Sequence, residues 1–356
     1  MKTRINSLIF IVLIIFSVST FAQDTLVYSV ALVRHADRTP WSDAAFKNVN
    51  YKWPFALGEL TPRGMQQEYQ LGREFRQKYV DKYHLLTENY IPGSIYALST
   101  EMNRTVMSAD CLLAGFYPPG TGPKLADGQP ALPDQMQVIP VFTITGGQKN
   151  FICPELENPD TVKILIYATL GQPMFLDEQK KYAADLKRWG AIMGADFPDM
   201  RTLLGASDYI NCMLTNNAPL PKGLTKSDAE KMVNAGFVNQ AELYSTDGVT
   251  RYMASDFMKR LNGELNRAAQ GKQTNKLALY LGHDTSVLAV MSAIRSPLPN
   301  NPPYAAHVEF DLFKNDAGQY YMTATYNGVA VKFANTGKDS CTLEQFAALT
   351  SPYTAQ

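Results

Sequence analysis

The sequence lacks an excess of charge of either sign. Its 356 residues include 33 lysine and arginine side chains and 33 aspartate and glutamate side chains, so the formal net charge is zero. Proteins that bind nucleic acids or anionic membrane surfaces usually carry a basic excess. The balance therefore argues against either as the main partner, and any strong positive potential has to be local.

Cysteine is scarce as well. The chain has four cysteines, and no C-x-x-C pair occurs among Cys111, Cys153, Cys212 and Cys341. Cysteine-based metal sites usually need closely spaced ligands, so such a site is disfavoured. In an exported protein these four cysteines would allow three disulfide pairings, among which the sequence does not choose. We favour Cys153 with Cys341, because both lie at edges of the expected core domain.

An apolar run of membrane-spanning length is lacking at the N-terminus. The run at residues 8–16 is shorter than the roughly 20 residues that a spanning helix needs. Basic Lys2 and Arg4 precede it, and small residues around Ala22 follow it. This order is typical of a secretory signal peptide cleaved after Ala22. We expect a secreted or periplasmic protein of bacterial type with no membrane anchor. The chain also has no internal repeat and no low-complexity segment.

Histidine is rare, and two of the four histidines follow apolar runs. Residues 26–33 are apolar and rich in β-branched side chains, which predicts a buried strand. Arg34, His35 and Arg38 come directly after it. Their charges repel unless an anion lies between them, and guanidinium groups suit phosphate oxygens. In open α/β sheets ligands bind at the carboxyl ends of strands. The stretch therefore predicts a phosphate site that contains a nucleophilic histidine.

A second strand repeats this arrangement near the C-terminus. Residues 276–281 are apolar, and His283 and Asp284 follow them. Taken alone, either stretch could hold surface charges and a structural histidine. The repetition at two strand ends favours one shared site instead. The other two histidines, His84 and His307, have no candidate partners nearby and are interpreted as structural.

Four motifs in the same order resemble those of the histidine acid phosphatases, the branch of the histidine phosphatase superfamily that includes prostatic and lysosomal acid phosphatases and phytases. The motifs lie at residues 34–40, 60–65, 99–109 and 283–285, and the resemblance extends from about residue 26 to about residue 352. Ala36 stands where this family usually has glycine. The resemblance implies a nucleophile, His35, a proton donor, Asp284, and phosphate ligands, which are Arg34, Arg38, Arg104 and His283.

The resemblance also implies the fold. It is expected to be an α/β fold with a mixed, largely parallel central sheet flanked by helices, similar to phosphoglycerate mutase, and a smaller helical cap. The region between about residues 178 and 270 is mostly polar with helical periodicity, which agrees with a helical insertion. We expect a signal peptide at residues 1–22, a core of residues 23–150 and 271–356, and a cap of residues 151–270.

The implied activity is metal-independent hydrolysis of phosphate monoesters through a phosphohistidine, with broad specificity and an acidic pH optimum. No cofactor is expected, small-molecule esters are the expected partners, and a homodimer is left open. One alternative is a phytase, although Ser286 stands where family phytases commonly carry asparagine. A second is a secreted phosphate-ester binder that has lost catalysis, with Ala36 as the suspicious change. A third is a metallophosphatase using His35, Asp37, His283 and Asp284, which the flanking arginines disfavour.

Overall fold

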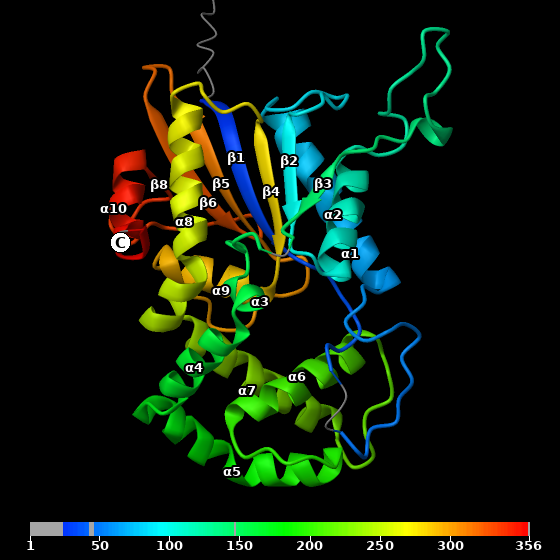
Figure 1. The fold of residues 1–356 in the computed structure, drawn as a ribbon, viewed down its shortest axis with the longest axis vertical. Helices are drawn as coiled ribbons and strands as arrows, with labels where there is room; N and C mark the ends of the chain where they lie inside the picture. The colour runs from blue at the N-terminus through cyan, green and yellow to red at the C-terminus, as the bar shows by residue number, and fades with distance from the viewer. Residues whose placement is uncertain (1–23, 43–45, 146, 355–356) are drawn as a thin grey trace, which may run out of the picture.

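The structure is a computed structural model that describes residues 24–42, 46–145 and 147–354 (Figure 1). The expected signal peptide at residues 1–22 lies outside the described residues. Among the helices that are described, none combines the length and the apolar character needed to cross a bilayer.

A single mixed sheet forms the centre of the described chain (Figure 1). Its strands are β1 (Thr25–Arg34), β2 (Ile95–Ser99), β3 (Val141–Thr143), β4 (Leu277–Gly282), β5 (His307–Lys314), β6 (Tyr320–Tyr326), β7 (Val329–Ala330) and β8 (Ser340–Cys341). The order is β3-β2-β4-β1-β5-β6-β7, and β8 pairs with β6. Strands β3, β2, β4 and β1 are parallel to one another, and the other pairings are antiparallel. The predicted mixed sheet is therefore confirmed.

Helices cover both faces of this sheet, and a further group of helices lies beyond the carboxyl ends of its parallel strands (Figure 1). They are α1 (Pro62–Arg76), α2 (Asn103–Phe116), α3 (Pro154–Glu157), α4 (Pro159–Leu170), α5 (Pro173–Met193), α6 (Met200–Thr215), α7 (Lys226–Tyr244), α8 (Asp247–Ala269), α9 (Asp284–Ala293) and α10 (Leu343–Thr354), with a π-helix η1 (Gln77–Lys82) after α1 and a short 3-10 helix η2 (Pro133–Gln135). Helix α1 begins at a local signal, because the Thr61 side chain accepts the Gly64 N–H and Pro62 fills the first helical position.

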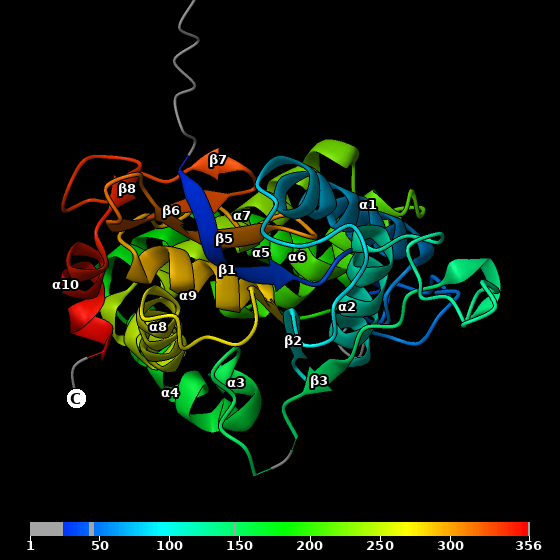
Figure 2. The ribbon, with the colours of Figure 1, turned by 90° about the horizontal axis from the view of Figure 1, so that it is seen from above.

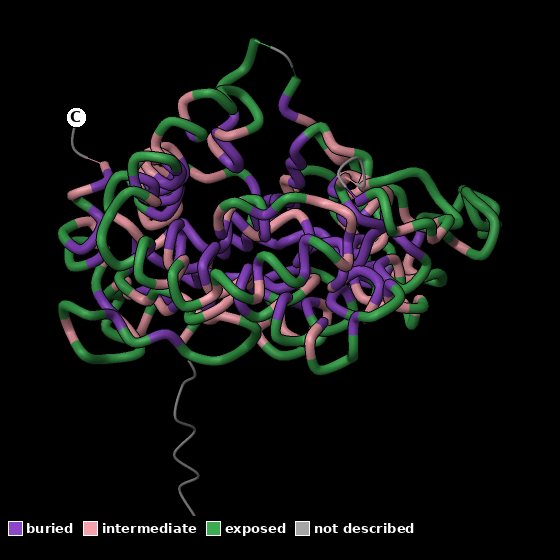
Figure 3. Tube along the Cα trace, turned by 90° about the horizontal axis from the view of Figure 1, so that it is seen from below, coloured by how far each residue is buried: buried purple, intermediate pink, exposed green. Residues whose placement is uncertain are grey.

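Alternating side chains of the strands divide the core into two layers. On β4, Leu277, Leu279 and Leu281 pack with α1 and α2, whereas Ala278 and Tyr280 pack with α8 and α9. This alternation is the period of two that an extended strand imposes. Figure 2 shows α1 and α2 on one side of the sheet and α8 and α9 on the other. Figure 3 shows the buried residues gathered in the interior of the molecule and the exposed residues along its outside.

A third apolar cluster lies beyond the carboxyl ends of the parallel strands, among α5, α6 and α7 (Figure 1). It includes Trp189, Leu203 and Met232 and also takes in Phe46 from the segment after β1. Helix α8, by contrast, packs along the sheet against β1, α9 and α10. The division into a core and a cap at residues 151 and 270 remains a prediction.

The favoured disulfide is wrong for this structure, in which all four cysteines are free thiols. Cys153 precedes α3, and its sulfur lies 3.9 Å from the Thr285 hydroxyl at the start of α9. Cys341 lies on β8 and is paired in register with Met322 of β6, on the antiparallel side of the sheet. The sequence placed both cysteines beside the core, but it carried no information on which strand each would meet.

Candidate active site

The site is assembled by the pairing of β1 with β4. These strands are parallel neighbours, and their register places Arg34 opposite Gly282. The His35 N–H continues the ladder by donating to the Gly282 carbonyl over 3.0 Å. As a result, the His35 and His283 ring centroids lie 5.4 Å apart. Two segments almost 250 residues apart in sequence thus meet at one edge of the sheet.

His35 has a defined tautomer. Its Nδ1 lies 2.9 Å from the carbonyl oxygen of Ala36. A carbonyl oxygen only accepts hydrogen bonds, so Nδ1 carries the proton and Nε2 of the neutral ring keeps its lone pair. Burial, reinforced by the Arg104 and Arg38 guanidiniums, holds the pKa of His35 well below its usual value. The ring is therefore neutral at ordinary pH, with an unprotonated Nε2.

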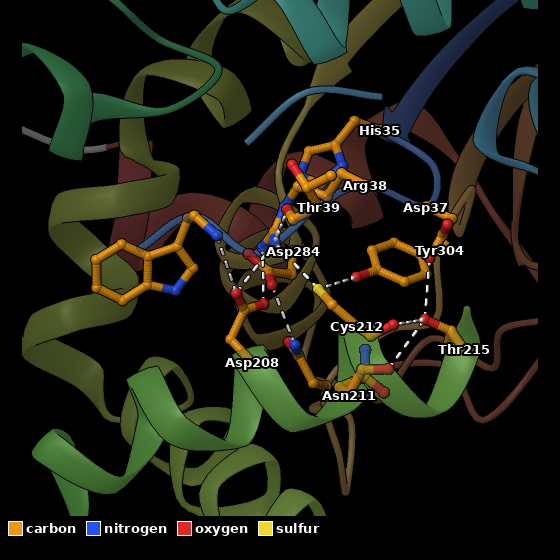
Figure 4. Close-up of polar contacts among 12 residues, drawn as sticks. His35, Asp37, Arg38, Thr39, Asp208, Asn211, Cys212, Thr215, Asp284 and Tyr304 are labelled. Atoms are coloured by element: carbon orange, nitrogen blue, oxygen red, sulfur yellow. Dashed lines mark hydrogen bonds and ion pairs between the residues drawn. The ribbon is translucent and has the colours of Figure 1, made fainter. Parts of the chain in front are cut away.

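The loop after His35 is held by hydrogen bonds on several sides. The Asp37 carboxylate accepts hydrogen bonds from the Thr61 hydroxyl, from the Thr215 hydroxyl at 3.0 Å and from the Asn216 amide at 3.1 Å. Figure 4 shows Asp37 facing Thr215 of α6. The carboxylate is thus committed to three donors, which leaves it poorly suited to the metal-ligand role weighed above. Within the described residues, no group of three or more metal-ligating side chains is found.

Ala36 fits its position without strain. Its backbone N–H donates to the Ser108 hydroxyl over 3.2 Å, and the residue is fully buried. Ala36 is not among the described non-glycine residues with positive φ. The backbone therefore does not require glycine here, and the methyl group is accommodated in the core.

Arg34 and Arg38 have different acidic partners. Arg38 donates two hydrogen bonds to the Asp208 carboxylate, at 2.8 and 3.0 Å (Figure 4). Arg34 donates to Asp284 Oδ2 over 3.1 Å and lies 4.6 Å from the centre of the Tyr304 ring. Asp208 neutralises Arg38 and fixes the plane of its guanidinium fork.

Arg104, in the first turn of α2, completes the set of guanidiniums. Burial and the neighbouring Arg38 lower the pKa of Arg104 to about 10. Within the described residues, the buried Nε atoms of Arg34, Arg38 and Arg104 have no hydrogen-bond partner. Buried donors that lack acceptors are costly, so the cluster is built to receive an anion with several acceptor oxygens.

Asp284 begins α9 and faces both arginine and amide donors. Its Oδ2 accepts from Arg34 at 3.1 Å and from the Asn301 side chain at 3.0 Å. Burial alone would raise the pKa of Asp284, but Arg34, the Asn301 hydrogen bond and the further charges of Arg38 and His283 together lower the pKa to about 2. Burial and Arg104 lower the pKa of His283 to about 3. The His283 Nε2 lies 3.0 Å from the Thr100 hydroxyl, which fixes the ring.

All six residues singled out from the sequence meet around one cavity of about 570 Å³ between the sheet and α4, α6 and α7. Five of them line it directly: His35, Arg38, Arg104, His283 and Asp284. Arg34 reaches the site through its contact with Asp284.

The sequence reasoning missed several polar residues of this site. Asp208 and Asn301 hold the charged groups from α6 and from the segment before β5. Glu155 lines the cavity and accepts hydrogen bonds from the Thr285 hydroxyl at 2.5 Å and the Tyr244 hydroxyl at 2.6 Å. None of these residues lies in a motif, and the stretch of residues 178–270 that supplies Asp208 showed only helical periodicity.

The sequence pattern of the histidine phosphatase superfamily (branch 2) matches residues 25–327. The chain belongs to this family. The match spans both strand-end motifs and the helices between them, so the whole site lies within it.

Curated relatives and solved structures agree with this assignment. Lysosomal acid phosphatase of Xenopus laevis is 28% identical over an alignment of 364 positions, gaps included, that covers 97% of this chain and 81% of that protein. Prostatic acid phosphatase of Mus musculus is 26% identical and covers 100% of this chain and 93% of its own length. The phytase of Hafnia alvei in its apo form superposes with a TM-score of 0.69 at 15% identity, over 94% of this chain and 98% of that one. This last likeness concerns the fold alone.

Proposed function

We propose that this histidine phosphatase is a secreted acid phosphatase that hydrolyses phosphate monoesters through a covalent phosphohistidine, without a metal ion and with broad specificity. The observation that carries the proposal is the unprotonated Nε2 of a neutral His35 beside buried guanidiniums whose Nε atoms have no acceptor among the described residues. A phosphate group would supply those acceptors and present its phosphorus to the imidazole. The lysosomal and prostatic acid phosphatases among the relatives support the same reaction class.

In the first step His35 Nε2 attacks phosphorus in line with the ester oxygen. The N–P bond forms as the P–O bond breaks, and the alcohol leaves with a proton from Asp284. Arg38, Arg104 and His283 hold the non-bridging oxygens, over which the transition-state charge spreads. Arg34 joins them once the phosphate competes with Asp284 for its guanidinium.

In the second step water attacks the phosphohistidine. Asp284 takes a proton from the water as the new P–O bond forms and the N–P bond breaks. Inorganic phosphate leaves, and His35 returns to its neutral state. Asn301, which donates to Asp284 Oδ2, would hold this carboxyl group in position in both steps.

The low pKa of Asp284 has a consequence for the pH profile. In the free enzyme its carboxyl group, with a pKa of about 2, is ionised at any ordinary pH. The proton needed by the leaving group would then enter with the ester as its monoanion, whose second pKa is about 6. Transfer of this proton from the bound ester to Asp284 leaves a phosphate dianion beside a neutral carboxyl group. The negative charge of the phosphate favours the protonated form of Asp284. Activity should therefore decline as the pH rises above about 6.

A direct assay tests the proposal. Purified protein is incubated with p-nitrophenyl phosphate between pH 4 and pH 8, with and without EDTA. We expect turnover with an acidic optimum that EDTA does not change. Absence of turnover would favour a non-catalytic binder, and loss of activity with EDTA would favour metal-dependent hydrolysis. N-terminal sequencing of the exported protein tests cleavage after Ala22.

A further inference from the structure

Glu68 is a buried carboxyl group that takes no part in the proposed reaction. It lies on α1, is fully buried, and acts electrostatically on the Cys111 thiol of α2. Among the described residues, neither of its carboxyl oxygens has a partner with full hydrogen-bond geometry. Burial raises the pKa of Glu68 well above its usual value, and the Ser108 hydroxyl opposes this only in part. The folded protein therefore keeps this carboxyl group neutral well above the pH at which an exposed glutamate ionises.

The elements packed against Glu68 offer it no positive charge. Within the described residues, no cation contributes to the shift of its pKa. On α2, burial raises the pKa of the Cys111 thiol to about 11, so the thiol is neutral, and Asp110 is exposed. On the loop after β1, His35 is neutral and the Asp37 carboxylate is committed to three donors. A buried carboxyl group without a cation costs stability and is rare in native proteins, so Glu68 calls for a function that offsets this cost.

The loop that carries the nucleophile is held by three consecutive backbone N–H groups. The His35 N–H donates to β4 over 3.0 Å. The Ala36 N–H donates to the Ser108 hydroxyl over 3.2 Å. The Asp37 N–H donates to the side-chain oxygen of Gln67 over 3.0 Å. Two of the three acceptors are thus side chains, one on α2 and one on α1, and the position of the loop depends on these two helices.

Glu68 lies between the two closest contacts that α1 makes. Helices α1 and α2 pack side by side (Figure 2). A Cβ atom at Gly64 would lie 2.2 Å from the carbonyl oxygen of Asp37, and one at Gly72 would lie 1.9 Å from the carbonyl oxygen of Leu112 on α2. Residues 64, 68 and 72 are spaced by four and share one face of the helix. Glu68 therefore sits on the face that touches both the loop and α2.

The Ser108 hydroxyl connects Glu68 to the loop. It uses a lone pair to accept the Ala36 N–H, so its own proton remains to be donated. The Ala36 carbonyl oxygen in turn lies 2.9 Å from Nδ1 of His35. We propose that Glu68 is a positioning residue for His35, an inference that rests on the proposed function because it concerns the nucleophile of that reaction. Its carboxyl oxygen accepts the Ser108 proton, and the Ser108 hydroxyl holds Ala36 so that the Ala36 carbonyl keeps the imidazole in its Nδ1–H form.

The first test separates positioning from a merely structural role. Glu68→Met replaces the carboxyl group by an apolar group of similar size. It should lower kcat for p-nitrophenyl phosphate about fivefold to 50-fold, because the nucleophile is less well oriented. It should also raise the urea midpoint of unfolding, because a desolvated carboxyl group is removed. A wild-type kcat, or a urea midpoint that falls together with kcat, would overturn the proposal.

The pH dependence of that gain in stability follows from the protons bound by Glu68. In the unfolded chain its carboxyl group ionises above about pH 4.3, whereas the folded protein keeps the proton because burial raises the pKa. The wild type therefore loses stability as the pH rises through this range, and Glu68→Met does not. The difference between their urea midpoints should grow from pH 5 to pH 7. A constant difference would show that Glu68 is ionised in the folded protein and would contradict the proposal.

Further variants test the connection through Ser108. Glu68→Gln keeps a carbonyl oxygen for the Ser108 proton and should retain kcat within about threefold of the wild type. Ser108→Ala should lose as much kcat as Glu68→Met, and the double variant should lose no more, because both changes break one chain of contacts. Glu74→Met changes an exposed side chain of the same helix and should leave kcat and the urea midpoint unchanged. Additive losses in the double variant would overturn the proposal.

A spectroscopic measurement distinguishes failure of this inference from failure of the proposed function. If the wild type turns over no ester, the catalytic proposal fails, but the ring of His35 can still be observed by NMR in protein labelled with ¹⁵N-histidine. His35→Ala assigns its signals among those of the four histidines. Glu68→Met and Ser108→Ala should shift these signals from the Nδ1–H form towards the Nε2–H form, whereas Glu68→Gln and Glu74→Met should not. Identical His35 signals in the wild type and in Glu68→Met would overturn the inference.

Discussion

Replacing Asp284 by asparagine isolates the proposed proton-transfer step. The amide has nearly the shape of the carboxylate and can still accept through its oxygen from Arg34 and Asn301, which now contact Oδ2 at 3.1 and 3.0 Å. It cannot donate an acidic proton. With alkyl phosphates, whose alkoxides leave poorly, kcat should fall by about two to four orders of magnitude, the usual contribution of a general acid.

The leaving group supplies the first internal control. Nitrophenolate departs with little protonation, so Asp284→Asn should cost much less with p-nitrophenyl phosphate than with methyl phosphate. Asp316→Asn, in the exposed turn between β5 and β6, is the matched control and should leave both substrates at wild-type rates. Equal losses on the two esters in Asp284→Asn would refute the assignment of Asp284 as the acid.

The pH profile supplies the second control. The number of protons that the reaction needs determines whether kcat/KM rises or falls with pH. The wild-type reaction with alkyl phosphates needs one proton, carried by either Asp284 or the ester. Above the ester's second pKa of about 6, that proton is lost and kcat/KM should fall about tenfold per pH unit. In Asp284→Asn no carboxyl group delivers this proton to the leaving group. The fall of kcat/KM above pH 6 should therefore become shallower in this variant. An unchanged alkaline limb in the variant would contradict the reasoning.

Three further predictions concern other parts of the molecule. Arg104→Ala removes a buried guanidinium whose Nε has no partner among the described residues; it should raise KM and lower kcat together, and unchanged kinetics would place Arg104 outside the site. Lys78→Met leaves two buried carboxylates, Glu309 at 2.9 Å and Asp311 at 2.7 Å, without their cation. It should lower the free energy of unfolding by about 3 kcal/mol in urea titrations with kcat unchanged, and a loss below about 1 kcal/mol would refute the role of this pair. Thiol titration of the denatured, unreduced protein should find four free cysteines. A count of two free thiols would show that the other two cysteines form a disulfide.

The parts of the fold that could be predicted from the residues themselves were those with a local sequence pattern. The apolar run before Arg34 and the run before His283 became β1 and β4, because a buried strand needs only its own residues to be recognised. The mixed sheet followed from the resemblance to the family. The pairing of β1 with β4 is a long-range event that no local pattern states. The sequence predicted only that the two strand ends share one site, because ligands gather at the carboxyl ends of strands.

The helical block shows where such reasoning stops. Asp208 lies on α6 with no flanking signature, yet it binds both terminal nitrogens of Arg38. Glu155 lies on the short helix α3 and accepts a hydrogen bond from Thr285 at the start of α9. Such partners are chosen by tertiary packing, and an isolated acidic residue in a polar helix has the same local appearance whether it is solvated or paired. The pairing of Cys153 with Cys341 failed for the same reason.

The central claim is that His35 accepts the phosphoryl group, and trapping the intermediate tests it most directly. The enzyme is mixed with ³²P-labelled p-nitrophenyl phosphate at low temperature, quenched in alkali, digested and mapped, with His35→Ala as the control. We predict acid-labile label on the peptide that contains His35, attached at Nε2, and no label in the variant. Label on a different residue, or turnover by the variant at the wild-type rate, would contradict the account.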